Sequence, residues 1–420
     1  MKVMLVKNIS YSVLFKILRM TLSLMMVPLL LEILGVTNYG LWAALTSLIV
    51  WVTLFDFGMG NALKNSVSKA VAIGKPELAH DEFYQVIKLS VFSSFVIVLI
   101  FLFTLFSVNF FRENLIVSMS LFLPIIILFP LRVASFVLQG ARQIAMDSGL
   151  MFLNTLIFFA MITGVYLLDV SIGLILLAVS FVISYSISIL LVASKAMKIL
   201  NIRIYDFNKI LKVEFDFIRI KLGLKFFGLQ VSSLVLYSLG TIIVYSYLSS
   251  EHAAQFDIVN KIFVFGLSFF SIVIGAFWPE ITTHRAASDF RSIRSLYFKM
   301  IGLSLIFTIA AFIIAYFSPY IVQVWTGSKL EVTRHQAMFF ALLVSTQAIA
   351  YSGAVILNAF EKINIQLVLS LVTTVLMLPL TIYTIRLGYE IEAVPIVSAM
   401  LTSIAMVYCN VHAYKLIREN

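Results

Sequence analysis

Charged side chains are scarce in this sequence: Asp, Glu, Lys and Arg make up 12% of its 420 residues, about half of the roughly 25% that is usual for soluble globular domains. Hydrophobic residues reach 61%. Apolar runs long enough to span a bilayer recur from end to end of the chain. The composition therefore predicts an integral membrane protein.

Cysteine and nucleotide-binding motifs are also missing. The single cysteine, Cys409, excludes an internal disulfide, and no Cys-x-x-Cys pair or histidine cluster suggests a metal site. The sequence contains no Gly-x-x-x-x-Gly-Lys-Ser/Thr run, which excludes ATP binding by that route. We predict no metal and no cofactor, and we expect an ion gradient, the membrane potential or substrate flux to supply the energy for any transport.

The apolar runs predict helices, because the strands of a membrane barrel would alternate in polarity and these runs do not. The first run follows Lys2 and Lys7 without a small-residue cleavage site, so we interpret it as a retained helix. The predicted fold class is an all-α polytopic membrane protein with about twelve transmembrane helices. The predicted spans are 9–31, 40–63, 86–110, 115–140, 149–168, 171–194, 223–248, 256–279, 299–324, 335–360, 363–386 and 391–414.

Lys and Arg are distributed unequally between the two sides of these spans. Counted on alternate sides from the N-terminus, 22 lie in the loops and termini of one side and only four in the loops of the other. Positive residues accumulate in cytoplasmic loops, so both termini are predicted to be cytoplasmic. The outer loops are short, including a tight turn at 32–39. This topology accounts for most of the net charge of +10, and no nucleic acid is predicted as a partner.

The longest inner loop divides the spans evenly. We predict an N-terminal six-helix bundle at 1–194, a basic cytoplasmic connector at 195–222 and a C-terminal six-helix bundle at 223–420. The fourth span of each half ends in a related run, LQGARQI at 138–144 and LNAFEKI at 357–363. Six spans per half give both halves the same orientation, so the repeat would be parallel, with two bundles around a central cavity.

Five charged residues remain within the predicted spans. Lys16, Arg19, Arg132 and Lys261 are cations and Asp56 is an anion, which leaves a net charge of +3. An acidic residue near the middle of a lone helix costs about 2.5–3.5 kcal/mol on insertion scales, and arginine is charged at any physiological pH. The surplus of cations predicts an aqueous cavity that binds an anion, and Arg with Lys suits phosphate, pyrophosphate or carboxylate.

Polar stripes on several helices would line this cavity. At about 100° per residue, polar side chains align on the first, second, fourth, seventh, tenth and eleventh predicted spans. The candidate lining residues are Trp42, Gln139, Gln230, Tyr237 and Gln347.

Simpler interpretations stay open for these residues. Stripes of Ser, Thr and Gln also hold helices together. Lys261 follows Asp257 by four residues, the spacing of an ion pair within one helix. Asp56 could neutralise one of the two arginines as a structural pair, and Lys16 could extend to the cytoplasmic surface.

A resemblance to a known family rests on residues 35–75. The segment reads GVTNYGLWAALTSLIVWVTLFDFGMGNALKNSVSKAVAIGK, and it resembles the second-helix region of Wzx-type O-antigen flippases and related polysaccharide exporters. A Tyr-Gly-x-Trp start, an Asp-x-Gly-x-Gly-Asn segment and a basic loop recur in that family. On this pattern Asp56, Gly58, Gly60 and Asn61 correspond to the family motif.

The resemblance implies a flippase of the polysaccharide transporter family, in the MATE-like MOP superfamily, that alternates between inward- and outward-open states. Such a protein moves undecaprenyl-pyrophosphate-linked oligosaccharide, for example an O-antigen unit of lipopolysaccharide biosynthesis, across the bacterial inner membrane to the periplasmic face. Implied partners are the lipid bilayer, a coupled H⁺ or Na⁺, a polysaccharide polymerase and a chain-length regulator. The roles of the four cations do not come from the resemblance but from their depth in the predicted spans and the helix face on which they lie. On that basis Lys16, Arg19 and Arg132 would hold the pyrophosphate and Lys261 would attract anionic groups, while Asp56 would act as counter-ion or coupling carboxylate.

Other functions stay open beside this one. A lipid II flippase or a drug/cation antiporter of the same superfamily is an alternative, although an antiporter for cations would need a net negative cavity. A membrane polysaccharide polymerase or ligase would be expected to carry a sizeable outer loop with catalytic Arg or His residues. The predicted outer loops are short and hold four basic residues in total, which argues against an enzyme.

Overall fold

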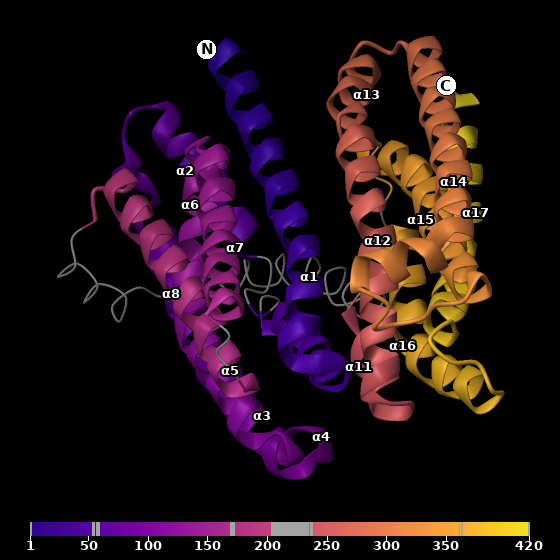
Figure 1. Cartoon of the computed structure of the whole chain (residues 1–420). Coiled ribbons are helices and arrows are strands. Elements are labelled where there is room, and N and C mark those ends of the chain that lie inside the picture. The colour runs from indigo at the N-terminus through magenta and orange to yellow at the C-terminus, as the bar shows by residue number, and fades with distance from the viewer. Residues whose placement is uncertain are drawn as a thin grey trace. The chain divides into compact units, whose positions relative to one another are not determined.

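A computed structural model of the chain describes residues 2–52, 55, 59–168, 173–202, 235, 238–360, 362 and 364–418. These residues form helices joined by turns and short connections, and they contain no strand (Figure 1). The all-α fold class predicted from the sequence is therefore confirmed for the described part of the chain.

Helices in the first half of the sequence are mostly long and apolar. They are α1 (Lys2–Val52), α2 (Met59–Ala72), η2 (Pro76–Ala79), α3 (His80–Ser107), α4 (Asn109–Glu113), α5 (Leu115–Leu128), η3 (Phe129–Arg132), α6 (Val133–Gly140), α7 (Ile144–Leu167) and α8 (Leu174–Ile199). Those in the second half are α11 (Gly240–Tyr247), α12 (Ser250–Gly275), α13 (Phe277–Ala286), α14 (Phe290–Thr326), α15 (Arg334–Ala359), α16 (Asn364–Arg386) and α17 (Ala393–Arg418).

Ten helical stretches among the described residues are long and apolar enough to span a membrane. The first of them, Ser10–Val52, is 43 residues long, about twice the length that one crossing requires. It covers the first predicted span and the start of the second. The seventh predicted span, 223–248, lies mostly outside the described residues and is represented there by α11.

Helix α1 is interrupted at one residue. Gly35 has φ 72° and ψ 170°, whereas the residues on both sides are helical. The predicted turn at 32–39 is therefore wrong in extent, because the break is confined to a single position. Glycine adopts a positive φ without a steric penalty, since it has no Cβ, and this allows two helices to follow each other without a loop.

The chain divides into two compact units, and each is described separately. Unit 1 comprises Met1–Gly35 and Leu48–Gln230. In unit 1, α8 contacts α5, α6 and α7, while α2 packs on α6. Its hydrophobic core includes Leu63, Val67, Tyr84 and Leu138, each at most 1% exposed.

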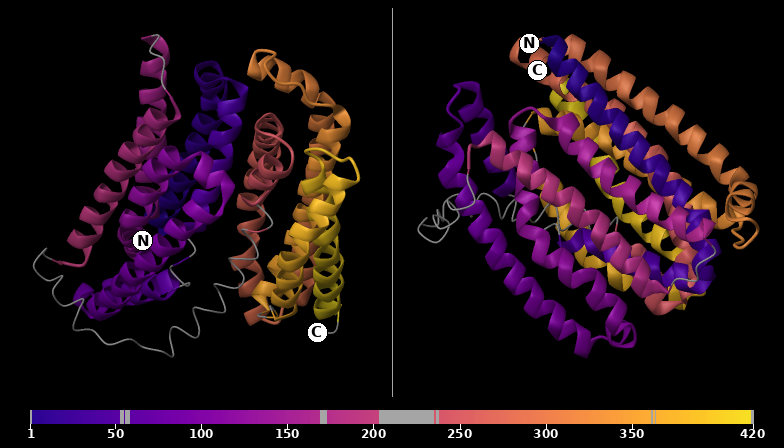
Figure 2. Two further views of the ribbon diagram at one scale, coloured as in Figure 1. Left: turned by 90° about the horizontal axis from the view of Figure 1, so that it is seen from below. Right: turned by 60° about the vertical axis from the view of Figure 1, so that its left-hand side comes forward.

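Unit 2 comprises Val36–Ser47 and Val231–Asn420. Its central helix is α15, which contacts α12, α14 and α17, and these helices run alongside one another in the views of Figure 2. Buried Met300, Val355 and Ile356 belong to the core that these helices share. Because α15 is surrounded on several sides, it buries more of its surface than the other candidate spans.

The part of α1 that follows the kink belongs to unit 2 although it comes from the first half of the sequence. Its Gly40 lies so close to the carbonyl oxygen of Ser250 that no Cβ could be accommodated. The hydroxyl of Ser250 also donates a hydrogen bond to the carbonyl oxygen of Thr37. The predicted division into bundles 1–194 and 223–420 stays a prediction, and most of the predicted connector 195–222 lies outside the described residues.

Candidate functional site

Two arginines from distant parts of the sequence are brought together in unit 1. Arg19 lies on α1, and Arg132 is the last residue of the 3-10 turn η3 between α5 and α6. Their guanidinium groups are near enough for the two like charges to interact, and Tyr185 of α8 lies within the field of Arg132. The structure thus places two of the four predicted cations side by side.

The position of Arg132 follows from a local break in the helix. Pro130 lies at the start of η3, and proline provides no backbone N–H for the α-helical hydrogen bond to the preceding turn. The chain therefore tightens into a 3-10 turn before α6 resumes at Val133. This break presents Arg132 beside α1.

Neither arginine is neutralised by the described part of the chain. None of the described residues forms an ion pair with Arg19 or Arg132. Arg19 is exposed and Arg132 is partly buried, yet protein atoms crowd the surroundings of Arg19. An accessible but crowded cation is able to contact a bound anion. Asp56, the predicted counter-ion, lies outside the described residues.

Lys16 and Lys261, the other two predicted cations, differ in their surroundings. Lys16 lies one turn before Arg19 on α1, and its side chain is exposed. Lys261 lies in unit 2 and forms an ion pair with Asp257, four residues earlier on α12. The hydroxyl of Tyr39 donates a hydrogen bond to the same carboxylate, with an O···O distance of 2.6 Å. The structure thus contains the intrahelical pair that the sequence spacing left open.

Asp147 is a buried carboxylate that the sequence analysis missed. It lies in the first turn of α7, and only 8% of its surface is exposed. Its Oδ2 accepts a hydrogen bond of 2.9 Å from the Nε2 of Gln139, whereas Oδ1 has no hydrogen-bond partner among the described residues. The predicted span began at residue 149, which placed Asp147 in a loop. In fact α7 begins at Ile144.

The structure does not bring the predicted lining residues together within one unit. Trp42 is 4% exposed and Gln347 is 7% exposed, so both lie within the packed interior of unit 2. Gln139 lies in unit 1, where it supports Asp147 as described above. Gln230 and Tyr237 lie outside the described residues. A role for these five side chains in lining a cavity stays a prediction.

One residue of the family motif has a visible packing role. Gly60, in the first turn of α2, faces the ring of Phe136 on α6 so closely that a Cβ could not be accommodated without movement of the ring. Gly58 lies outside the described residues, as does the side chain of Asn61. In the structure, the motif therefore marks a close contact between α2 and α6.

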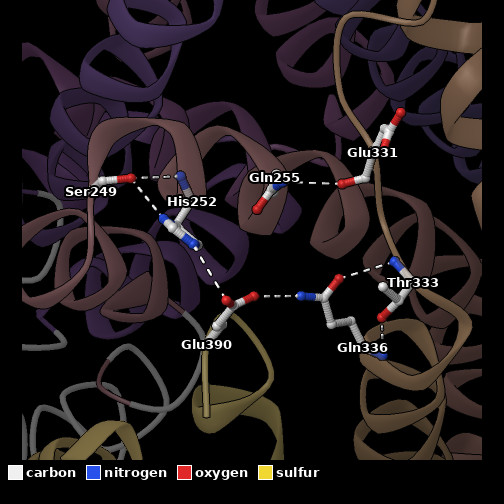
Figure 3. A network of polar contacts seen from close by, with 7 residues as sticks. All are labelled: Ser249, His252, Gln255, Glu331, Thr333, Gln336 and Glu390. Atoms are coloured by element: carbon white, nitrogen blue, oxygen red, sulfur yellow. Dashed lines mark hydrogen bonds and ion pairs between the residues drawn. The ribbon is translucent and has the colours of Figure 1, made fainter. Parts of the chain in front are cut away.

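A second polar network in unit 2 links the start of α12, the start of α15 and the turn between α16 and α17 (Figure 3). The carboxylate of Glu390, between α16 and α17, lies 4.0 Å from the Nε2 of His252 near the start of α12. It also accepts a 3.0 Å hydrogen bond from the Nε2 of Gln336, which forms a capping box with Thr333 at the start of α15. The capping box of Thr333 and Gln336 has the sequence spacing that such boxes require. Its contact with Glu390 joins positions 54 residues apart, so the spacing does not indicate it.

Metal ligands do not cluster in the part of the chain that the structure describes. No group of three or more His, Cys, Asp or Glu side chains there could hold a metal ion.

The fold is similar to solved structures of MATE transporters. An inward-facing multidrug resistance MATE family transporter of the MOP superfamily aligns with a TM-score of 0.76 and 13% identity, over 99% of this chain and 98% of that chain. An outward-facing structure with the same description aligns with a TM-score of 0.63 and 13% identity, over 98% and 96%.

A MOP superfamily transporter from Pyrococcus furiosus Vc1 (DSM3638), whose binding pocket is described as having reverse polarity, aligns with a TM-score of 0.62 and 14% identity, over 98% of this chain and 96% of that chain. No protein-family model and no curated protein sequence matches this chain. At this level of identity the alignments show the fold, which is that of the MATE transporters over the whole length of the chain.

Proposed function

We propose that this protein is an alternating-access flippase for polyprenyl-pyrophosphate-linked oligosaccharide. The observation that carries the proposal is the pair of arginines, Arg19 and Arg132, which lie together in unit 1 without an ion pair among the described residues. Arg19 is accessible to a ligand and yet is surrounded by protein atoms, as a residue in a binding site for an anion must be.

The physical argument concerns the cost of two like charges within spanning helices. Each Arg near the middle of a spanning helix costs about 2.5–3.5 kcal/mol on insertion scales. Bringing two of them together adds repulsion to that cost. A pyrophosphate offers several oxygens with negative charge, and each guanidinium can donate two parallel hydrogen bonds to such a group. Lys16, one turn before Arg19, would add a third cation.

The fold supports movement of the bound anion across the membrane. Solved proteins of this fold include inward-facing and outward-facing transporters, and alternation between such states would expose Arg19 and Arg132 to each side in turn. The sugar and the pyrophosphate would occupy the protein, while the polyprenyl chain would stay in lipid. An inside-negative potential of 100 mV would assist outward movement of two negative charges by roughly 4.6 kcal/mol.

The resemblance of residues 35–75 to Wzx-type flippases supports the substrate class, namely an O-antigen or similar repeat unit of polysaccharide biosynthesis. It also supports a location in the bacterial inner membrane with cytoplasmic termini. A coupled H⁺ or Na⁺, a role for Asp56 in that coupling, and contacts with a polysaccharide polymerase and chain-length regulator belong to the same proposal.

Complementation tests the proposal directly. In cells that lack the native flippase, Arg19→Ala and Arg132→Ala should each abolish surface polysaccharide while the protein remains in the membrane. Arg19→Lys should retain part of the activity, because it keeps the charge and loses the bidentate geometry. Arg291→Ala, at an exposed position at the start of α14, is the matched control and should behave as the wild type. Normal polysaccharide from both alanine variants would contradict the proposal.

A drug/cation antiporter is the second candidate, because two of the structural neighbours are described as multidrug resistance transporters. Arg19 and Arg132, which form no ion pair with any residue that the structure describes, argue against a cationic cargo in unit 1, since like charges repel. A resistance assay separates the two functions: expression should not raise the tolerance of sensitive cells to cationic dyes.

A further inference from the structure

An exposed apolar stripe on α17 ends in two cations. Counted at about 100° per residue, six side chains share one face of the helix within an arc of about 80°. They are Met400, Ile404, Val407, Val411, Lys415 and Arg418, and we call them the α17 stripe. The four apolar members are between 51% and 57% exposed, and both cations are exposed. Cys409, Ala413 and Ile417 on the opposite face are buried in the core of unit 2, so the stripe faces away from that core.

A groove of about 510 Å³ follows this stripe. Its lining residues are Ile404, Val407, Tyr408, Val411, His412 and Lys415. The rings of Tyr408 and His412 are stacked, with centroids 5.5 Å apart and an interplanar angle of 17°. The groove is therefore apolar and aromatic along most of its length and cationic at one end.

The stripe has the length of one lipid leaflet. From Met400 to Val411 a helix rises about 16 Å, which is close to half of the roughly 30 Å hydrocarbon core of a bilayer. Lys415 and Arg418 follow within the next two turns, where the headgroups of that leaflet would begin. A lipid whose acyl chain lies along the stripe would thus bring its phosphate to these two cations.

Helix α14 adds an aromatic ring and a third cation at the same end (Figure 1). The exposed ring of Phe298 lies 6.5 Å from the ring of Tyr414 on α17, edge to face. The guanidinium of Arg294 lies over Phe298, 5.9 Å from its centroid, which is an attractive arrangement. None of the described residues forms an ion pair with Arg294, Lys415 or Arg418. These three cations are therefore available to a bound anion.

Helix α8 of unit 1 provides an internal comparison. It also has exposed apolar side chains, among them Ile187, and its last turns carry exposed Lys195 and Lys198. The spacing of these lysines equals that of Lys415 and Arg418. Among the described residues, no aromatic ring lies beneath either lysine. The end of α8 therefore has the charge of the α17 end without its aromatic and cationic neighbour from a second helix.

We propose that the groove on α17 and the cations beside it bind one anionic phospholipid of the adjacent leaflet. One acyl chain lies along the α17 stripe, and the phosphate lies between Lys415 and Arg418, with Arg294 adding attraction from α14. Basic residues at the end of a spanning helix favour anionic headgroups. A zwitterionic headgroup would bring its own cation to these three and would be held less tightly. With the predicted orientation of the termini, this leaflet is the cytoplasmic one.

A second copy of this chain fits the surface less well. In a twofold contact the same patch of both copies meets itself, so Lys415 and Arg418 would approach the same cations of the other copy. An acyl chain that ends in a phosphate covers the apolar stripe and also neutralises its end. Charge complementarity therefore favours the lipid.

Native mass spectrometry of the purified full-length protein tests the proposal. The protein is titrated with phosphatidylglycerol or with phosphatidylcholine of the same acyl chains, and the dissociation constant of each successive lipid is measured. We expect the first phosphatidylglycerol to bind about tenfold more tightly than the first phosphatidylcholine, since one cation near a headgroup contributes about fivefold. In the double variant Lys415→Ala with Arg418→Ala, the first phosphatidylglycerol should bind as weakly as the later ones.

Two matched controls use the end of α8. Lys195→Ala with Lys198→Ala removes the same charge and should keep the tight first phosphatidylglycerol. Val407→Trp fills the groove and keeps every cation, and it should also lose the tight first lipid. Ile187→Trp places the same ring on α8 and should bind as the wild type does. All of these positions are exposed, so the substitutions should leave the fold intact.

Equal losses in the two double alanine variants would overturn the proposal, because the effect would then belong to basic residues at the membrane surface in general. A wild-type dimer that Val407→Trp converts to a monomer would also overturn it, since a second copy would then cover the stripe. Tighter binding of undecaprenyl phosphate than of phosphatidylglycerol at this site would overturn it as well. None of these results bears on the flippase proposal, which depends on Arg19 and Arg132 of unit 1.

Discussion

Glycine residues allow the backbones of several helices to approach each other closely. A Cβ on Gly353 of α15 would lie 2.7 Å from the backbone carbonyl carbon of Cys409 on α17, and one on Gly140 of α6 would lie 2.6 Å from the carbonyl oxygen of Lys64 on α2. In membranes such close approaches are a main source of helix association, because lipid provides no hydrophobic drive between helices. Backbone atoms cannot rotate away from an added methyl group as a side chain can.

Gly353→Ala should therefore destabilise unit 2. Overpacking of this kind costs about 1–3 kcal/mol, which outweighs the gain of about 1 kcal/mol from replacing Gly by Ala within a helix. Gly302→Ala is the matched control, because a Cβ at Gly302 of α14 meets nothing within 4 Å. Thermal unfolding in detergent should show a lower midpoint for Gly353→Ala and an unchanged or higher midpoint for Gly302→Ala. Equal midpoints for the two variants would contradict the close contact.

The sequence predicted some residue contacts and missed others for a physical reason. The pair of Asp257 with Lys261 follows from a spacing of four within one helix. The bond from Tyr39 to Asp257 joins positions 218 residues apart, and no periodicity reports such a contact. Arg19 and Arg132 could be selected because charge is costly in a membrane, although their proximity depends on tertiary packing. The burial of Asp147 was missed because α7 begins earlier than the apolar pattern indicates.

At the level of helices, the start of α14 depends on a capping carboxylate. Asp289 accepts a hydrogen bond of 3.1 Å from the backbone N–H of Ser292, and its other oxygen lies 3.1 Å from the Nδ1 of His284 at the end of α13. These bonds, chiefly those with Ser292 and then that with His284, lower the pKa of Asp289 below its usual value. A pKa that is lower in the folded state means that the cap stabilises above the unfolded-state pKa and is lost as pH falls through the folded-state pKa.

Asp289→Ala should accelerate amide hydrogen exchange in the first turn of α14 at about pH 7, because the N–H of Ser292 loses its acceptor. Asp289→Asn, which also caps helices well, should exchange nearly as the wild type does. In acid below the folded-state pKa, the difference between wild type and Asp289→Ala should shrink, whereas the difference between the Asn and Ala variants should persist. Wild-type exchange in Asp289→Ala at neutral pH would show that the cap is unimportant.

Helix boundaries could be predicted less well than the existence of helices. Long apolar runs identify spanning segments, since a crossing needs about 20 residues. Breaks within a run depend on single residues. Gly35 interrupts α1 by one backbone angle, and Pro130 converts one turn between α5 and α6 to a 3-10 turn. Neither break changes the mean hydropathy of the segment, so a hydropathy average does not reveal either of them.

At the level of the whole molecule, the two halves of the sequence share a local arrangement. In unit 1, Gly140 near the end of α6 packs on the carbonyl of Lys64 in α2. In unit 2, Arg285 of α13 donates a 2.7 Å hydrogen bond to the carbonyl of Ala359 at the end of α15 and lies over the ring of Phe360. In both cases the extension of the second predicted span contacts the end of the fourth. The two related sequence runs lie at these helix ends, and the parallel repeat that they suggest stays a prediction.

The assignment of Val36–Ser47 to unit 2 could not be predicted from the sequence. Sequence order and charge counts assign every residue before 195 to the first bundle. The packing places this segment in unit 2 instead, because Tyr39 and Gly40 contact α12. The chain thus leaves unit 1 at the kink of Gly35 and returns near Leu48, so one continuous helical stretch contributes to both units.

The asymmetry of the basic residues predicts the orientation of the whole protein in the membrane, and reporter fusions test this prediction. Basic residues flank the connection between α13 and α14, with Arg285 before it and Arg291 and Arg294 after it, so this connection should be cytoplasmic. The connection between α14 and α15, which contains Lys329 and is followed by Arg334, should face the periplasm. Alkaline phosphatase, which is active only outside the cytoplasm, should be active when fused after Lys329 and inactive when fused after Ser288. A fusion after exposed Gly388, in the next outer connection, should be active as an independent check. The reverse pattern would place both termini in the periplasm. It would also contradict loading of the lipid-linked sugar from the cytoplasmic side, because Arg19 and Arg132 would then be reached from the opposite face.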